Sequence, residues 1–105
     1  MPTKIEAIRH EVAVYFEVKP RELQGMKRNI WYARPRMVAM YLARKLIVDA
    51  SYRMIGQWFG NRNHSTVVKN IQKVKQLCAK NGPTRDAVII IEGRLTRVFE
   101  AANAH

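Results

Sequence analysis

The 105-residue sequence contains a single cysteine, Cys78, and therefore has no partner for an internal disulfide. Its four prolines and five glycines are too few for a low-complexity or collagen-like chain. No apolar run approaches the roughly 20 residues that a membrane span requires, and the start MPTKIEA lacks the apolar segment of a signal peptide. These absences favour a cytoplasmic protein in a reducing compartment, with no membrane segment.

Acidic residues are also scarce: 8 Asp and Glu oppose 19 Lys and Arg, which gives a formal net charge of +11. Residues 19–80 hold 14 bases and 2 acids, a local charge of +12, whereas the two flanks together hold 5 bases and 6 acids, or −1. Segregated positive charge is typical of a surface that binds phosphate groups. One alternative is a generally basic soluble protein without such a partner. An anionic membrane surface fits less well, since no expected helix pairs a broad apolar face with a basic one.

The side chains that support catalysis, metal binding or nucleotide binding are not grouped in this sequence. There is no G-x-x-x-x-G-K-[ST] motif, so we expect no nucleotide site and no ATPase activity. His10 and His105 have no Cys or carboxylate cluster at ligand spacing, which argues against a metal site. We find no nucleophile–base pair and no paired carboxylates. We therefore expect a protein that is not an enzyme and that uses no cofactor.

What the sequence does contain is helical periodicity along its whole length. With 48% apolar and 9% aromatic residues, it should form one domain over residues 1–105 with a modest core. We expect an all-α fold of five to six helices. The first begins after Thr3, which is spaced from Glu6 as in a capping box, and a short second helix lies around residues 21–23. The VIII run at 88–91 has no partner strand, so we interpret it as helical.

Prolines, glycines and capping residues mark the later helices. Pro35 suits the first turn of a helix over residues 34–48, and a short helix, YRMIGQWF, should end before Gly60. Asn63 and Thr84 should cap the last two helices. The residues expected to face inward are Val38, Tyr41, Leu42 and Leu46 in the first of these helices, Val67, Ile71, Val74 and Cys78 in the helix after Asn63, and Val88, Ile91, Leu95 and Val98 in the last.

The corner at Gly60 joins two expected helices, and the second opens with four polar residues, Asn63, His64, Ser65 and Thr66. Two helices joined in this way describe a helix-turn-helix. In that unit the second helix lies in the major groove of DNA, and its N-terminal side chains contact base edges. The pattern indicates double-stranded DNA as the partner rather than RNA, because the deep, narrow major groove of A-form RNA does not admit such a helix.

Two stretches, ARPRMVAMYLARKL (33–46) and IGQWFGNRNHSTVVKNIQKVKQL (55–77), resemble the C-terminal DNA-binding domain of DnaA, the bacterial chromosomal replication initiator. That family shows A-R-P-R-Q, followed by I-G-x-x-F-G-G-R-D-H-T-T-V at the start of its recognition helix. The stretch TKIEAIRHEVAVYFEVKPREL resembles the family's first two helices, so the resemblance covers nearly the whole chain. It implies sequence-selective binding at sites like the initiator's boxes, association with the nucleoid, and regulation of replication initiation or transcription.

The resemblance also implies DNA contacts at particular residues. Arg28, with Lys27 beside it, falls on a loop arginine that enters the minor groove. Arg36, the second arginine of A-R-P-R, falls on a residue that reaches bases or backbone. The resemblance implies Arg36, Asn63, His64, Ser65 and Thr66 in the major groove, Lys27 and Arg28 at the minor groove, Arg44 on the phosphate backbone, and Arg34 and Met37 beside them. From the residues themselves we add Lys69 as a backbone contact, and Arg62 as a residue that either contacts phosphate or braces the turn.

Four positions depart from the family's pattern. Asn63 replaces an aspartate, and its amide donates as well as accepts, which suits adenine. Ser65 lacks a threonine methyl, and Met37 lacks the polar group of a glutamine. Asn61 replaces a glycine, and asparagine tolerates a positive φ better than most residues. Since one mismatched contact is typically worth about 1–3 kcal/mol, these changes should alter base preference without abolishing binding.

Other functions remain open from the sequence. An interaction protein could keep this fold, lose base recognition and bind the initiator or another replication protein, and the chain could also be a segment of a longer initiator. Trp58 and Phe59 should pack in the core rather than stack on bases. Lys69, Lys73 and Lys75 are either phosphate contacts or simply an exposed face. We expect a monomer, because no long apolar stripe is left for a dimer.

Overall fold

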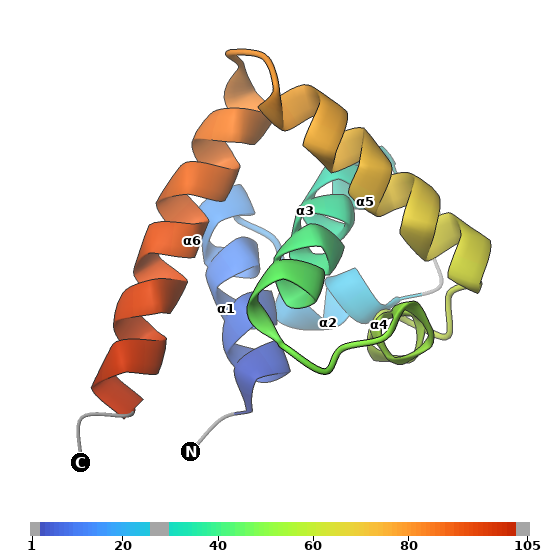
Figure 1. Cartoon of the computed structure of the whole chain (residues 1–105), viewed down its shortest axis with the longest axis horizontal. Helices are drawn as coiled ribbons and strands as arrows, with labels where there is room; N and C mark the ends of the chain where they lie inside the picture. Colours follow the sequence, from blue (N-terminus) through green and yellow to red (C-terminus); the bar gives the residue numbers. More distant parts are fainter. Residues whose placement is uncertain (1–2, 26–29, 103–105) are drawn as a thin grey trace.

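The computed structural model describes residues 3–25 and 30–102, and this part of the chain folds into α-helices without a strand. The helices are α1 (Lys4–Phe16), α2 (Pro20–Gln24), α3 (Ile30–Leu46), α4 (Tyr52–Trp58), α5 (His64–Cys78) and α6 (Pro83–Ala102). α3 lies in the middle, with α1 on one side and α5 on the other, and α6 runs alongside α1 (Figure 1). The predicted all-α fold is confirmed. No helix in these ranges is long and apolar enough to cross a membrane.

The first two helices begin where the sequence predicts. The Thr3 side chain caps α1 by accepting a hydrogen bond from the Glu6 N–H, at 3.3 Å. α1 ends at Phe16, and its C-cap, Glu17, adopts a left-handed conformation with φ 58°. Pro20 is the first residue of α2, where its missing N–H is not needed. These two helices set the position of Leu23 and Gly25, whose carbonyl groups are used by the site described below.

The central helix differs from the prediction. α3 begins at Ile30 and ends at Leu46, so Pro35 lies inside the helix rather than in its first turn. The prediction of a helix over 34–48 with Pro35 at its start was therefore wrong at both ends. The physical reason is that a proline removes only one intrahelical N–H, and residues 30–34 contain no glycine or proline that would stop the helix before it.

The start of the last helix also differs. α6 begins at Pro83, and Thr84 lies within its first turn with 4% of its surface exposed. The prediction that Thr84 caps this helix was wrong, because proline occupies the first helical position, which its fixed φ favours. The VIII run at 88–91 is helical, as predicted.

One core is formed by residues from all six helices, and Phe59 is its largest fully buried side chain. Trp58 packs against the same core, so both aromatics behave as predicted. Fully burying such a side chain contributes about 1.5–3 kcal/mol. Of the predicted inward residues, Val38, Leu42, Val67, Ile71, Val74, Val88, Ile91 and Leu95 are buried, Tyr41, Leu46 and Cys78 are half-buried, and Val98 is exposed.

Candidate nucleic-acid interface

The corner between α4 and α5 is built from backbone conformations that few residues adopt. Phe59 ends α4, Gly60 follows with φ 85°, and Asn61 has φ 58°. Both the end of the helix before Gly60 and the positive φ of Asn61 are confirmed. A side chain on Gly60 would overlap the carbonyl oxygen of Gln24, so the corner lies directly against the end of α2. Only glycine meets both requirements.

A second close approach fixes the angle between the two helices. The N–H of Arg62 donates to the carbonyl oxygen of Gly56, at 2.8 Å, which brings the corner back onto α4. A Cβ on Gly56 would overlap the Arg62 carbonyl oxygen. Gly56 is buried, so the backbone of the corner packs on α4 without an intervening side chain. The two glycines therefore hold α5 in a defined direction.

The Arg62 side chain braces this corner from within. Its Nε donates to the carbonyl oxygen of Phe59, at 3.0 Å, and its Nη2 donates to that of Gly25. Arg62 is half-buried; the first bond closes the corner on itself, and the second ties it to the end of α2. Of the two roles expected for Arg62, a phosphate contact or a brace of the turn, these bonds are those of a brace.

Arg36 is more deeply buried than Arg62 and donates to more backbone carbonyl groups. Its side chain is 6% exposed, and it donates to the carbonyl oxygen of Leu23 at 3.0 Å and to those of Glu22 and Gly25 at 3.3 Å each. Burial lowers the pKa of the Arg36 guanidinium, and the nearby charge of Arg62 lowers it further. The expected contact between Arg36 and the major groove does not match this geometry, because the side chain points inward and joins α2 to α3.

The start of α5 presents the predicted polar residues to solvent. Asn63 is the N-cap, as predicted, and its Oδ1 accepts a hydrogen bond from the Ser65 N–H at 2.8 Å. His64, Ser65 and Thr66 occupy the first turn and are exposed. The buried face of α5, formed by Val67, Ile71 and Val74, packs against the core on the other side of the helix. The first turn of α5 is therefore both rigidly mounted and open to a partner.

Positive charge continues along α5 and is not neutralised by ion pairs within the described part of the chain. Lys69, Lys73 and Lys75 are exposed on this helix. Across the described residues, the single salt bridge joins Lys45 to Glu92, on the side of the molecule where α3 meets α6. The α5 lysines consequently have no carboxylate partner among these residues, and they remain available to an anionic partner.

Arg44 and Tyr52 lie next to the start of α5. Arg44 Nη1 donates to the carbonyl oxygen of Ala50, at 2.6 Å, and its guanidinium carbon lies 4.3 Å from the centre of the Tyr52 ring. The Tyr52 ring in turn meets the His64 imidazole edge to face. The sequence reasoning missed Tyr52, since a tyrosine at a helix start gives no local signal of a contact with a residue beyond the corner.

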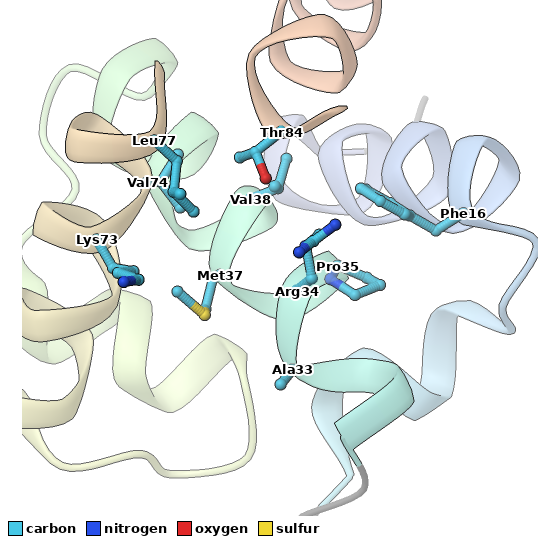
Figure 2. Close-up of a pocket in the computed structure, with 10 residues that line it drawn as sticks. All are labelled: Phe16, Ala33, Arg34, Pro35, Met37, Val38, Lys73, Val74, Leu77 and Thr84. Atoms are coloured by element: carbon cyan, nitrogen blue, oxygen red, sulfur yellow. The ribbon is translucent and has the colours of Figure 1, made fainter. Parts of the chain in front are cut away.

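Two more residues of the predicted set, Arg34 and Met37, border a pocket of about 660 Å³ between α3 and α5. Arg34 is exposed and Met37 is half-buried at its edge, and Figure 2 shows Met37 facing Lys73 of α5. Lys27 and Arg28 lie outside the described residues. The pocket is lined by Phe16, Ala33, Arg34, Pro35, Met37, Val38, Lys73, Val74, Leu77 and Thr84.

The helical fold of the described residues, with its glycine-dependent corner between α4 and α5 and the exposed, capped start of α5, defines a helix-turn-helix domain. The profile of the family described as "Bacterial dnaA protein helix-turn-helix" matches residues 5–74. The chain belongs to this family, which confirms the resemblance found in the sequence.

Individual relatives agree with this assignment. The chain is 48% identical over 73 residues to the chromosomal replication initiator protein DnaA of Acinetobacter baylyi, covering 70% of this chain and 16% of the relative. It is 34% identical over 91 residues to that of a Ruegeria species, covering 87% and 19%. A crystal structure described as a DNA replication initiation factor matches with a TM-score of 0.75 at 30% identity, covering 88% of this chain and 28% of that chain. The chain thus spans less than a fifth of the length of these curated relatives.

Proposed function

We propose that this chain binds double-stranded DNA sequence-selectively through α5, at sites like the DnaA boxes, and thereby regulates replication initiation or transcription. The observation that carries the proposal is the exposure of His64, Ser65 and Thr66 on the capped first turn of α5, in a helix-turn-helix of the DnaA family. The curated relatives are named as chromosomal replication initiators. The sequence has no phosphate-binding loop motif, so we propose that binding proceeds without ATP hydrolysis.

The first turn of α5 would enter the major groove. The side-chain amide oxygen of Asn63, Oδ1, is used in the cap, so the side-chain NH₂ is the group left to donate to a base edge. The Thr66 methyl is suited to the methyl group of a thymine, and the hydroxyls and the imidazole to hydrogen bonds with base edges. Adenine and thymine positions in the target should therefore depend most on Asn63 and Thr66.

The phosphate contacts would come from a smaller set of cations than the sequence predicts. Lys69 and Arg34 are exposed, and neither has a carboxylate partner among the described residues. Arg36 and Arg62 instead donate to backbone carbonyl groups of the protein. Arg44 donates one bond to the Ala50 carbonyl group but is exposed, so its other N–H groups can still contact phosphate. We retain Lys27 and Arg28 as the proposed contacts with the minor groove, on the strength of the resemblance and of the negative potential that attracts arginine there.

The proposal is tested by measuring affinity for a duplex that carries a DnaA box and for a scrambled duplex, at two salt concentrations. We expect the box to bind more than about a hundredfold more tightly. Affinity for both duplexes should fall with salt as roughly 5–8 phosphate contacts release counterions. His64→Ala and Thr66→Ala should each remove most of the preference. Thr96→Ala, an exposed threonine on α6, is the matched control and should leave it intact.

Equal and weak binding to both duplexes would contradict the proposal. Selection from a random pool of duplexes would then reveal any changed target sequence. If selection recovers no sequence, the alternative function, an interaction protein that keeps the fold and binds another replication protein, would take its place.

A further inference from the structure

Tyr52 lies between two residues that the resemblance places at DNA, Arg44 and His64. The Arg44 guanidinium carbon is 4.3 Å from the centre of the Tyr52 ring, within the range of a cation–π contact. The Tyr52 and His64 ring centres are 5.3 Å apart with an angle of 88° between the rings, which is edge-to-face geometry. Since these residues belong to α3, α4 and α5, the cluster joins the three helices at the start of the proposed recognition helix.

Tyr52 is anchored by its own helix, by the core and by Arg44. It is the first residue of α4, whose N-cap is the Ser51 hydroxyl, which accepts from the Met54 N–H at 3.1 Å. Its ring is half-buried and packs against the core. Arg44 is anchored in turn by its 2.6 Å bond to the carbonyl oxygen of Ala50, which is 1% exposed. The Tyr52 ring therefore has little freedom to move.

His64 has less support of its own. It is the first residue of α5, its side chain is exposed, and among the side chains described, those of residues 3–25 and 33–102, the Tyr52 ring is its one aromatic contact. An exposed side chain that becomes ordered only on binding reduces affinity, because its rotamer freedom is lost at that moment. A contact that orders the imidazole before binding removes this entropy cost. The gain applies only to a DNA sequence whose bases match the fixed orientation of the imidazole.

We propose that Tyr52 is a positioning residue for DNA recognition: held by Arg44, its ring fixes the His64 imidazole in the orientation that contacts a base. The inference rests on the proposed function. It assigns Arg44 a bracing role in addition to the phosphate contact implied by the resemblance, since Arg44 is exposed and the bond to Ala50 uses only one of its N–H groups. It also adds a specificity-determining residue on α4, outside the recognition helix itself.

The test compares Tyr52→Leu, which removes the ring, with Tyr52→Phe, which keeps it. We expect Tyr52→Leu to reduce the preference for a DnaA-box duplex over a scrambled duplex by about two- to tenfold. Affinity for the scrambled duplex and the melting temperature should change little, and Tyr52→Phe should behave as the wild type. The inference is overturned if Tyr52→Leu weakens binding to both duplexes equally, or if it keeps the full preference for the DnaA-box duplex.

A double-mutant cycle isolates the pair. In a His64→Ala background, Tyr52→Leu should cause no further loss of preference, because the residue that it positions is gone. The same loss in both backgrounds would show a role unrelated to His64 and overturn the inference. A wild-type protein that prefers neither duplex overturns the proposed function and this inference together, whereas failure of the cycle alone overturns only the inference.

A measurement on the wild type covers the case in which Tyr52→Leu does not fold. In the DNA-bound protein, nuclear Overhauser contacts between the ring protons of Tyr52 and the imidazole protons of His64 should be present. Their absence would overturn the inference without use of any variant.

Discussion

Arg36 and Arg62 donate to the same acceptor, the carbonyl oxygen of Gly25 at the end of α2. One guanidinium comes from α3 and the other from the corner that precedes α5, so a single carbonyl group links both elements to α2. Two positive charges brought this close repel each other, and this repulsion adds to burial in lowering the pKa of Arg36. The arrangement shows that part of the strongly basic segment stabilises the fold rather than facing a partner.

Arg36→Ala should lower the free energy of unfolding by about 2–4 kcal/mol, because it leaves the Leu23 and Glu22 carbonyl groups without this donor and removes a buried side chain. Urea denaturation monitored by circular dichroism measures the change. Arg34→Ala is the matched control: Arg34 is exposed on the same helix, and its loss should alter stability by no more than about 0.5 kcal/mol. An Arg36→Ala protein with wild-type stability and weakened DNA binding would instead identify Arg36 as a direct contact.

Local features of the fold were predictable because they depend on residues close in sequence. Apolar residues at helical spacing indicated the helices, the Asn63 cap lies two residues from the N–H that it binds, and Gly60 and Asn61 have the φ values that their residue types suggest. The exposed first turn of α5 follows from the same local pattern. Pro35 was misleading because its preference for a first turn is a tendency, and the helix extends through it.

The roles of the buried cations were not predictable in the same way. Arg36 bonds to carbonyl groups 11–14 residues away, and Arg62 to one 37 residues away. In a sequence, an arginine within a basic segment looks the same whether it points outward or inward. Tyr52 was missed for a related reason, since its contacts with Arg44 and His64 exist only after α3, α4 and α5 have packed.

Gly56→Ala should lower the free energy of unfolding by about 1–3 kcal/mol, because the new methyl group would overlap the Arg62 carbonyl oxygen and force the corner away from α4. Gly93→Ala is an informative control, since a Cβ at that position of α6 meets no atom within 4 Å. It should raise the free energy of unfolding by about 0.5–1 kcal/mol through helix propensity alone. Thermal denaturation of the two variants shows whether each change raises or lowers stability. A Gly56→Ala protein with wild-type stability would show that the corner can adapt.

Asn63 is expected to have separable roles in stability and in recognition. Asn63→Ala removes the acceptor for the Ser65 N–H and should cost about 0.5–2 kcal/mol of stability. Asn63→Asp keeps the acceptor and adds a negative charge at the helix start, so it should retain wild-type stability or exceed it by about 0.3–1 kcal/mol. It also loses the amide donor, so selection from a random duplex pool should return a different base at one position. An identical selected sequence for wild type and Asn63→Asp would exclude Asn63 from base recognition.

Lys69 and Thr66 should affect DNA binding in different ways, because one is proposed to contact phosphate and the other a base. Lys69→Ala should weaken binding to box and scrambled duplexes about equally and reduce the slope of log affinity against log salt concentration by about one. Thr66→Ala should weaken binding to the box duplex alone and leave the salt slope unchanged. Fluorescence anisotropy over a salt series measures both quantities.

The matched control for charge is Arg97→Ala, which removes one exposed cation from α6, away from the start of α5 (Figure 1). If the salt slope reports specific phosphate contacts along α5, Arg97→Ala should leave it unchanged. If the slope reports only the overall charge of +11, Arg97→Ala and Lys69→Ala should reduce the slope equally. The comparison thus decides whether the segregated charge of this chain forms a defined binding surface or acts as a diffuse attraction for DNA.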